Sequence, residues 1–172
     1  MGQTWKSKTT AKAIGCTGET LFAFRAMEEG FVVSQPMGDK SPYDFLIDNS
    51  EDILKVQIKL SESHEHEGTD KSAKYGFALK HSKQDKTYES HDVDFFGLVV
   101  IPLRSIWIVP QKAIDGITKV NVYPIGNSSG AMADYREQWI LLKSYFEYIE
   151  VAGPDDCHRG GRIDIKNYLT KK

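Results

Sequence analysis

The most regular alternation of apolar and polar residues lies between positions 53 and 60, which read Ile-Leu-Lys-Val-Gln-Ile-Lys-Leu. A period of two is typical of a β-strand with one buried face. The predicted buried face carries Leu54, Val56, Ile58 and Leu60, and the opposite face carries Ile53, Lys55, Gln57 and Lys59. Gln57 and Lys59 would therefore stand side by side, about 7 Å apart along the strand.

A preceding strand is predicted over residues 41–48, which are rich in aromatic and branched side chains. Residues 49–52 read Asn-Ser-Glu-Asp, a turn-forming run, so the two strands should form a hairpin. The hairpin returns the first strand alongside the second. Asp44 can then reach the end of the pair that carries Gln57 and Lys59.

Further strands are expected at residues 31–34, 95–101, 105–110 and 120–123. The segment 95–101 is almost wholly apolar, as in a strand that is covered on both faces, and should pair with 105–110 across a short turn.

A helix is predicted from Thr17, a favoured N-cap residue, to Glu28 or Glu29, with Gly30 ending it. Its large apolar stripe is Leu21, Phe24 and Met27, and a stripe of small side chains headed by a carboxylate is Glu19, Ala23 and Ala26. Small residues let a helix approach a sheet closely, which would bring Glu19 to the edge of the sheet. Alternatively, Glu19 only stabilises the positive N-terminus of the helix.

The remaining segments are more polar. We expect a loosely held basic arm at residues 1–15, a long functional or mobile loop at 61–92, irregular structure at 111–130, an amphipathic helix at 133–149 and a polar tail at 153–172. The aromatic stripe of the last helix has the spacing of helix burial, which favours a core or oligomer contact over stacking on bases.

The chain has 172 residues, of which 40% are hydrophobic, which is the size of one domain with its own core. Its net charge of −2 gives no overall basic excess, so a nucleic-acid surface would have to come from local clusters of basic residues. Cys16 and Cys157 are far apart and lack metal-site spacing, which indicates a reducing compartment. With no apolar run long enough for a membrane span and no signal-peptide pattern at the start, we expect a soluble cytoplasmic protein.

Three polar groups are expected to converge at this end of the hairpin, namely the carboxylate of Asp44, the amide of Gln57 and the ammonium of Lys59. Apolar packing does not explain their presence there. This set suits phosphodiester hydrolysis assisted by Mg²⁺, which prefers oxygen ligands and keeps several waters. Asp44 is the expected principal ligand, with the Gln57 side-chain oxygen and the Ile58 backbone carbonyl beside it. Glu19 would hold a second ion or orient a water, and Lys59 would stabilise charge on the phosphate or relay a proton.

The order of these residues resembles the PD-(D/E)xK nuclease superfamily. The matching motifs are Gly18-Glu19, Gly38-Asp39-x-Ser41-Pro42-Tyr43-Asp44, Val56-Gln57-Ile58-Lys59, Asp92-Val93-Asp94-Phe95-Phe96 and Trp107-Ile108-Val109-Pro110, which together span about residues 12–110. The similarity is greatest to a branch of small phage and archaeal-type endonucleases, including a cyanobacterial intron-encoded homing endonuclease and resembling Holliday junction resolvases. In that branch glutamine often replaces the middle acidic ligand, as Gln57 does here.

The resemblance implies a single-domain α/β protein with a restriction-endonuclease-like core, a mixed central β-sheet flanked by α-helices with the site at one end. Residues 111–172 would add a peripheral strand and helix that contact DNA or another copy of the chain. The resemblance also implies Mg²⁺ as the cofactor, with Mn²⁺ able to substitute. The amide of Gln57 removes one negative charge from the metal site, but Glu19, Asp44 and Lys59 are all present, which favours activity.

The predicted function is a Mg²⁺-dependent endonuclease for double-stranded DNA, site-specific and of the homing type. The alternatives are a resolvase that recognises branched DNA by shape and charge, and a non-catalytic DNA-binding module on a nuclease scaffold. Cutting both strands needs two sites, so we expect a homodimer or homotetramer. The candidate DNA contacts are Lys12, Ser41, Lys71, Lys74, Lys80, Lys83, Arg159 and Arg162.

Overall fold

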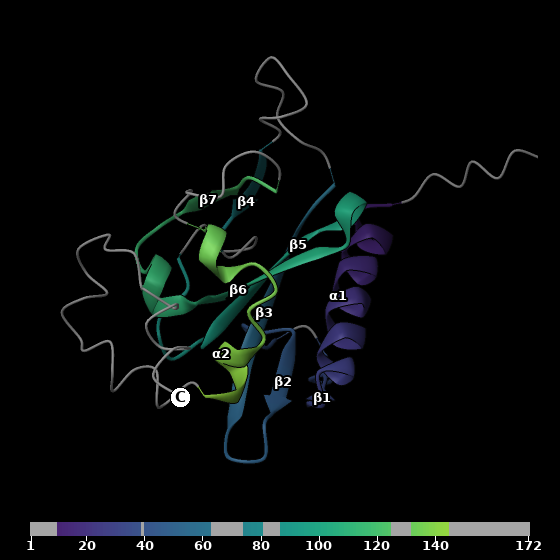
Figure 1. The fold of residues 1–172 in the computed structure, drawn as a ribbon, viewed down its shortest axis with the longest axis vertical. Helices are drawn as coiled ribbons and strands as arrows, with labels where there is room; N and C mark the ends of the chain where they lie inside the picture. Colours follow the sequence, from purple (N-terminus) through teal and green to yellow (C-terminus); the bar gives the residue numbers. More distant parts are fainter. Residues whose placement is uncertain (1–9, 39, 63–73, 81–86, 125–131, 145–172) are drawn as a thin grey trace, which may run out of the picture.

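The computed structural model describes residues 10–38, 40–62, 74–80, 87–124 and 132–144 (Figure 1). In chain order its helices and strands are α1 (Ala11–Glu28), β1 (Val32–Ser34), β2 (Phe45–Asp48), β3 (Ile53–Ser61), β4 (Tyr75–Ala78), β5 (Phe95–Val100), β6 (Ser105–Pro110), β7 (Lys119–Val122) and α2 (Ile140–Lys143). Short 3₁₀ helices occupy Ile101–Leu103, Gln111–Ile114 and Ala133–Tyr135. Among the helices in these ranges, none is both long and apolar enough to cross a membrane.

The main sheet has the strand order β1-β2-β3-β5-β6 and is mixed, as predicted. The hairpin of β2 and β3 is antiparallel, with Phe45 opposite Val56, and β3 then pairs in parallel with β5. Every residue of β5 is buried, which confirms the prediction of a strand covered on both faces. The predicted alternation in β3 is also confirmed, because Leu54, Val56 and Ile58 are buried.

The first helix begins earlier than predicted. Its N-cap is Thr10, whose hydroxyl accepts a hydrogen bond from the Ala13 amide at 3.3 Å. Thr17 does not cap the helix because its hydroxyl donates to the Ala13 carbonyl, one turn back, at 2.9 Å. The predicted basic arm is therefore helical from Ala11 onward, and its first nine residues lie outside the described ranges.

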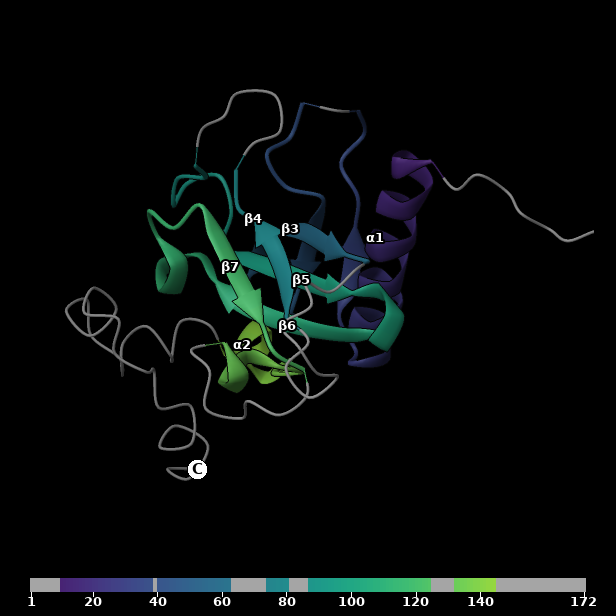
Figure 2. The ribbon, with the colours of Figure 1, turned by 90° about the horizontal axis from the view of Figure 1, so that it is seen from above.

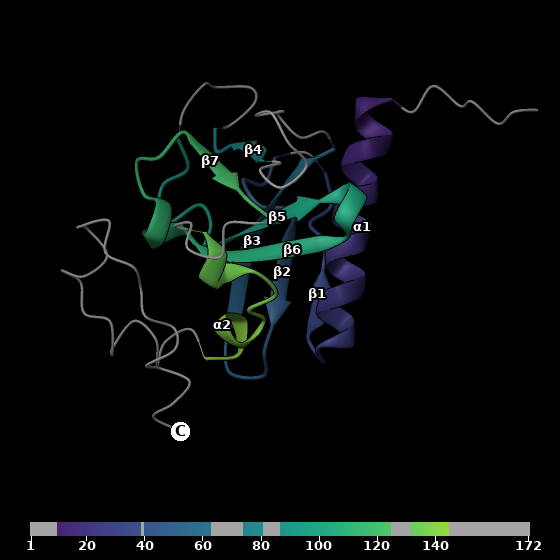
Figure 3. The same cartoon turned by 45° about the horizontal axis from the view of Figure 1, so that its top comes forward.

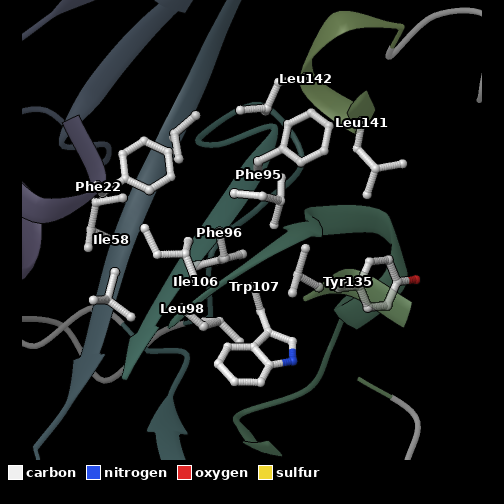
Figure 4. Close-up of a cluster of buried hydrophobic side chains, with 14 of the residues drawn as sticks. Phe22, Ile58, Phe95, Phe96, Leu98, Ile106, Trp107, Tyr135, Leu141 and Leu142 are labelled. Atoms are coloured by element: carbon white, nitrogen blue, oxygen red, sulfur yellow. The ribbon is translucent and has the colours of Figure 1, made fainter. Parts of the chain in front are cut away.

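The helix packs on the sheet through a different stripe from the large apolar one. Gly18, Phe22 and Ala26 are buried, whereas Phe24 and Met27 are 53% and 55% exposed. Figure 3 shows α1 running alongside β1, and Figure 4 shows Phe22 beside Ile58 of β3. The expectation that small residues allow close approach is right for Ala26, and Gly18 extends the same stripe.

Gly97 of β5 makes room for Phe22. A Cβ atom at Gly97 would lie 2.8 Å from the Phe22 ring and 2.7 Å from Ile58 Cδ1. The ring has nowhere to go, because it is fully buried and lies 6.0 Å from the ring of Phe45 and 5.5 Å from that of Trp139. We expect Gly97→Ala to lower the free energy of unfolding by about 1–3 kcal/mol through overpacking.

Gly15→Ala is the matched control for this substitution. Gly15 lies inside α1 with nothing within 4 Å of the position of a Cβ atom. Alanine there should stabilise the protein by about 0.5–1 kcal/mol, because glycine weakens a helix interior. Urea unfolding of both variants measures the difference, and equal stabilities would show that the Phe22 contact does not constrain β5.

A second sheet covers the other face of the main sheet. Strands β4 and β7 pair antiparallel, and Figures 1 and 2 show this pair on the side away from α1. The prediction that residues 61–92 form a loop is wrong for β4, where Tyr75 and Phe77 are buried, as is Leu79 directly after it. Within the predicted irregular segment 111–130, the expected short strand at 120–123 is present as β7, one residue earlier.

The predicted helix over 133–149 is not continuous. A 3₁₀ turn at Ala133–Tyr135 is separated from α2 by Glu137, whose φ of 54° is left-handed. Residues 145–149 and the predicted tail at 153–172 lie outside the described ranges.

Tertiary hydrogen bonds explain the break at Glu137. Its backbone amide donates to the Ile106 carbonyl at 2.8 Å, and its side-chain Oε1 accepts from the Ile106 amide at 2.8 Å. Its Oε2 accepts from Arg25 Nη2 and from Trp139 Nε1, both at 3.1 Å. Glu137 thus extends the edge of β6 and ties it to α1, which a helical conformation would not allow.

Candidate active site

Strand β3 is longer than its antiparallel partner β2. Its first four residues pair with β2, and residues 56–61 pair with β5, so that only Val56 pairs on both sides. The predicted strand 41–48 begins only at Phe45, but Asp44 still donates its backbone amide to the Val56 carbonyl at 3.0 Å. The Asp44 carboxylate is therefore held at the point where the two strands separate.

Two hydrogen bonds fix this carboxylate. Asp44 Oδ2 accepts from the Ile58 amide at 2.7 Å and from Gln57 Nε2 at 2.6 Å. Burial raises the pKa of Asp44, and the Ile58 amide, the Lys59 charge and the Gln57 amide oppose that rise without cancelling it. The fold thus keeps a carboxylate where its negative charge is poorly solvated, which favours a cation close by.

The Gln57 amide nitrogen lies between two oxygen atoms. It donates to Asp44 Oδ2 and also to the Ile58 backbone carbonyl at 3.2 Å. Both partners can only accept from it, so chemistry dictates that the nitrogen and not the oxygen faces them. These two oxygens converge on one point, and both belong to the ligand set expected from the sequence.

Glu19 approaches the same place from α1. The preceding residue, Gly18, brings the helix so close to β3 that a Cβ atom would lie 3.1 Å from Leu60 Cδ2. Burial, and then the negative charge of Asp44, raise the pKa of Glu19. The two carboxylates are therefore electrostatically coupled, which a simple interaction of Glu19 with the helix N-terminus does not require.

Lys59 lies one strand period beyond Gln57 on the same face of β3. Its Nζ donates to the Tyr88 hydroxyl at 3.0 Å and to the Lys80 carbonyl at 3.3 Å. Burial lowers the pKa of Lys59, and the nearby Asp44 charge opposes this. A half-buried cation thus stands next to a half-buried carboxylate without a direct ion pair between them among the described contacts.

These groups fit a divalent cation. Within the described ranges, no three His, Cys, Asp or Glu side chains form a metal-binding group, so the site departs from an all-acidic one. The available oxygens are instead those of two carboxylates that repel each other, Asp44 and Glu19, and of the Ile58 carbonyl. The Gln57 side-chain oxygen would join them if the amide group rotated by half a turn. Such hard oxygen donors, few in number, suit Mg²⁺.

A comparison with protein-family models gives a match over residues 9–142 to the PD-(D/E)XK endonuclease model. The chain belongs to this endonuclease family. The match extends past the motifs seen in the sequence, through β7 and into α2, so residues 111–142 also belong to the family's domain.

The fold is also that of a solved member of the homing endonucleases. The structure of a bacterial homing endonuclease, I-Ssp6803I, matches with a TM-score of 0.68 at 22% sequence identity, covering 82% of this chain and 98% of that chain. This confirms the restriction-endonuclease-like fold class. A search of curated proteins gave no significant match.

The candidate DNA contacts differ in how close they lie to the site, and only some of them fall within the described residues. Lys80 is at the site, because its carbonyl accepts from Lys59, while Ser41 is half-buried in the loop before Asp44. Lys12 is exposed on α1 and Lys74 is half-buried just before β4. The other candidates, Lys71, Lys83, Arg159 and Arg162, lie outside the described residues.

Sequence reasoning missed Tyr88 and the backbone of Lys80. Both belong to the segment interpreted as a long polar loop, yet Lys80 pairs with Thr87 in an isolated β-bridge that brings them to Lys59. The available signal was the alternation of Tyr75, Phe77 and Leu79, which marks a strand within that polar segment.

Proposed function

We propose that this chain is a Mg²⁺-dependent endonuclease that hydrolyses phosphodiester bonds in double-stranded DNA at specific sites. The observation that carries the proposal is the convergence of Asp44 Oδ2 and the Ile58 carbonyl on one point, with the charge of Asp44 acting on Glu19 and that of Lys59 acting on Asp44. This is the donor set that a hard cation and a phosphate group need together.

The site residues would have separate roles in binding the ion and in the reaction. Asp44, the Ile58 carbonyl, the Gln57 side-chain oxygen and Glu19 would hold the ion, and Mn²⁺ would be accepted in its place. When bound, the ion supplies charge stabilisation for the phosphoryl oxygens and lowers the pKa of water. Lys59 places its positive charge against the scissile phosphate, and Glu19 orients the attacking water or accepts its proton.

Site specificity of the homing type is supported by the similarity to a homing endonuclease over 98% of that chain. Reading a site requires side chains in the major groove, for which Lys80, next to the catalytic Lys59, is the first candidate. Two copies of the chain are needed to cut both strands, so the active form is a dimer or tetramer.

Nicking of supercoiled plasmid tests the proposal. We expect wild type to nick with Mg²⁺ or Mn²⁺ and not with EDTA, and Asp44→Ala and Lys59→Ala to lose at least about 100-fold in rate. Asp48→Ala and Lys55→Ala, on the same two strands, are the matched controls and should cut at the wild-type rate. Equal nicking by all variants would instead leave a non-catalytic DNA-binding module.

The DNA substrate separates the two nuclease alternatives. A site-specific enzyme cuts a linear duplex that contains its site and has no preference for a synthetic four-way junction of unrelated sequence. Preferential cutting of the junction, independent of its sequence, would assign the chain as a resolvase.

A further inference from the structure

The tip of Lys59 is held by groups that do not belong to its strand. An ammonium group has three N–H donors. One reaches the Tyr88 hydroxyl and one the Lys80 carbonyl, and the Nζ also lies 4.9 Å from the centroid of the Tyr88 ring. Within the described part of the chain the remaining N–H has no acceptor, which leaves it for a ligand.

Tyr88 is itself fixed from several sides. The residue is 7% exposed, and its ring meets Phe96 edge-on at 5.2 Å between centroids. Phe96 is the partner of Gln57 in the register of β3 and β5. The Tyr88 carbonyl accepts from Gln111 Nε2 at 3.4 Å. The hydroxyl is thus presented to Lys59 by a rigid ring, which a flexible side chain would not achieve.

The chemistry of a phenol suits this position. Burial, then the charges of Asp44 and Asp92, raise the pKa of Tyr88 to about 12, so the hydroxyl is neutral at physiological pH. A neutral oxygen accepts from the ammonium without cancelling its charge. A carboxylate at the same place would form an ion pair with Lys59 and reduce its attraction for a phosphate.

We propose that Tyr88 is the positioning residue of the site, and that its hydroxyl, together with the Lys80 carbonyl, aims the Lys59 ammonium at the scissile phosphate. This inference rests on the proposed function. It makes Lys80 and Tyr88, which lie between β4 and β5 in the sequence, part of the active site, because the bridge between Lys80 and Thr87 holds both of their oxygens near Lys59.

Tyr88→Phe tests the inference, because it removes the hydroxyl and keeps the ring contacts with Phe96 and Lys59. We expect single-turnover nicking of supercoiled plasmid, with enzyme in excess and Mg²⁺ present, to slow by about 10- to 100-fold, as befits the loss of a hydrogen bond to a charged group. Plasmid affinity, measured with Ca²⁺ in place of Mg²⁺, should stay at the wild-type value. Tyr135→Phe, which removes another buried tyrosine hydroxyl outside the site, is the matched control and should cut at the wild-type rate.

A double variant separates positioning from general stability. If Tyr88 acts through Lys59, Tyr88→Phe should slow Lys59→Met no further, as judged by nicked plasmid accumulated over long incubations. The inference is overturned if Tyr88→Phe cuts at the wild-type rate, if its slowing follows weaker DNA affinity, if Tyr135→Phe is equally slow, or if the two substitutions multiply. If wild type and Asp44→Ala nick equally, the proposed function has failed instead, whatever Tyr88→Phe does.

Discussion

Asp44→Asn is expected to reduce Mg²⁺-dependent cleavage by at least about 100-fold and at the same time to make the metal-free protein more stable. The loss of activity follows from removing the negative charge of the proposed principal ligand. The gain in stability follows because burial raises the pKa of Asp44 despite its favourable contacts, so the folded state disfavours the charged form. The asparagine oxygen can still accept from the Ile58 amide and Gln57.

The gain should depend on pH. With a folded-state pKa above its ordinary value of 3.8, Asp44 binds its proton more tightly in the folded protein than in the unfolded one. The charge on Asp44 therefore lowers the stability of wild type as pH rises from 3.8 through the folded-state pKa, and Asp44→Asn lacks this contribution. The difference between them should be fully developed at neutral pH and should vanish at pH values below 3.8.

Urea unfolding in EDTA at several pH values measures this difference. Asp48→Asn is the control, because Asp48 is an exposed carboxylate on the same strand that accepts from the Ser50 amide, as asparagine also can. Its stability should stay within about 0.5 kcal/mol of wild type. A less stable Asp44→Asn at neutral pH would mean that the contacts of Asp44 outweigh the cost of its burial.

Gln57→Glu is expected to destabilise the metal-free protein by about 1–3 kcal/mol, because a carboxylate replaces the amide that donates to Asp44 and the Ile58 carbonyl. It should also bind Mg²⁺ at least about tenfold more tightly, since the added charge draws in the cation. Mg²⁺ should consequently raise the melting temperature of this variant more than that of wild type. On this proposal, the Gln57 amide stabilises Asp44 and the Ile58 carbonyl in the metal-free site, as a bound cation would.

Isothermal titration with Mg²⁺ and melting with and without the ion check both parts. Gln138→Glu is the matched control, because it makes the same amide-to-carboxylate change where the amide donates to the Arg136 carbonyl, away from the site. It should show no Mg²⁺-dependent shift beyond that of wild type. Unchanged stability of Gln57→Glu in EDTA would contradict the geometry of the amide between the two oxygens.

The centre of the fold and of the site could be predicted because their signals are local. Alternation along β3 fixes which residues share a face, and a short turn fixes the partner strand, so Asp44, Gln57 and Lys59 were placed together from sequence. The almost wholly apolar sequence of β5 predicted a strand covered on both faces, and all of its residues are buried. No long-range information was needed for any of these.

The parts that failed depend on distant contacts. The helix start is the local exception: Thr17 has the right chemistry for a cap, but its hydroxyl donates to the Ala13 carbonyl and Thr10 caps the helix instead. The 133–149 pattern is helical in period, yet bonds from Glu137 to Ile106 and Arg25 override it. The role of Tyr88 could not be predicted from its neighbours in the sequence. The pairing of β4 with β7 and the bridge at Thr87 bring it to Lys59.

The bonds of Glu137 to Arg25 and Ile106 have a consequence for the order of events during synthesis. A nascent chain leaves the ribosome N-terminus first, so α1 emerges long before the residue that anchors it. Until position 137 has cleared the exit tunnel, the helix that carries Glu19 lacks this tether. The helix therefore acquires this tether only after nearly all of the residues matched to the family have been translated.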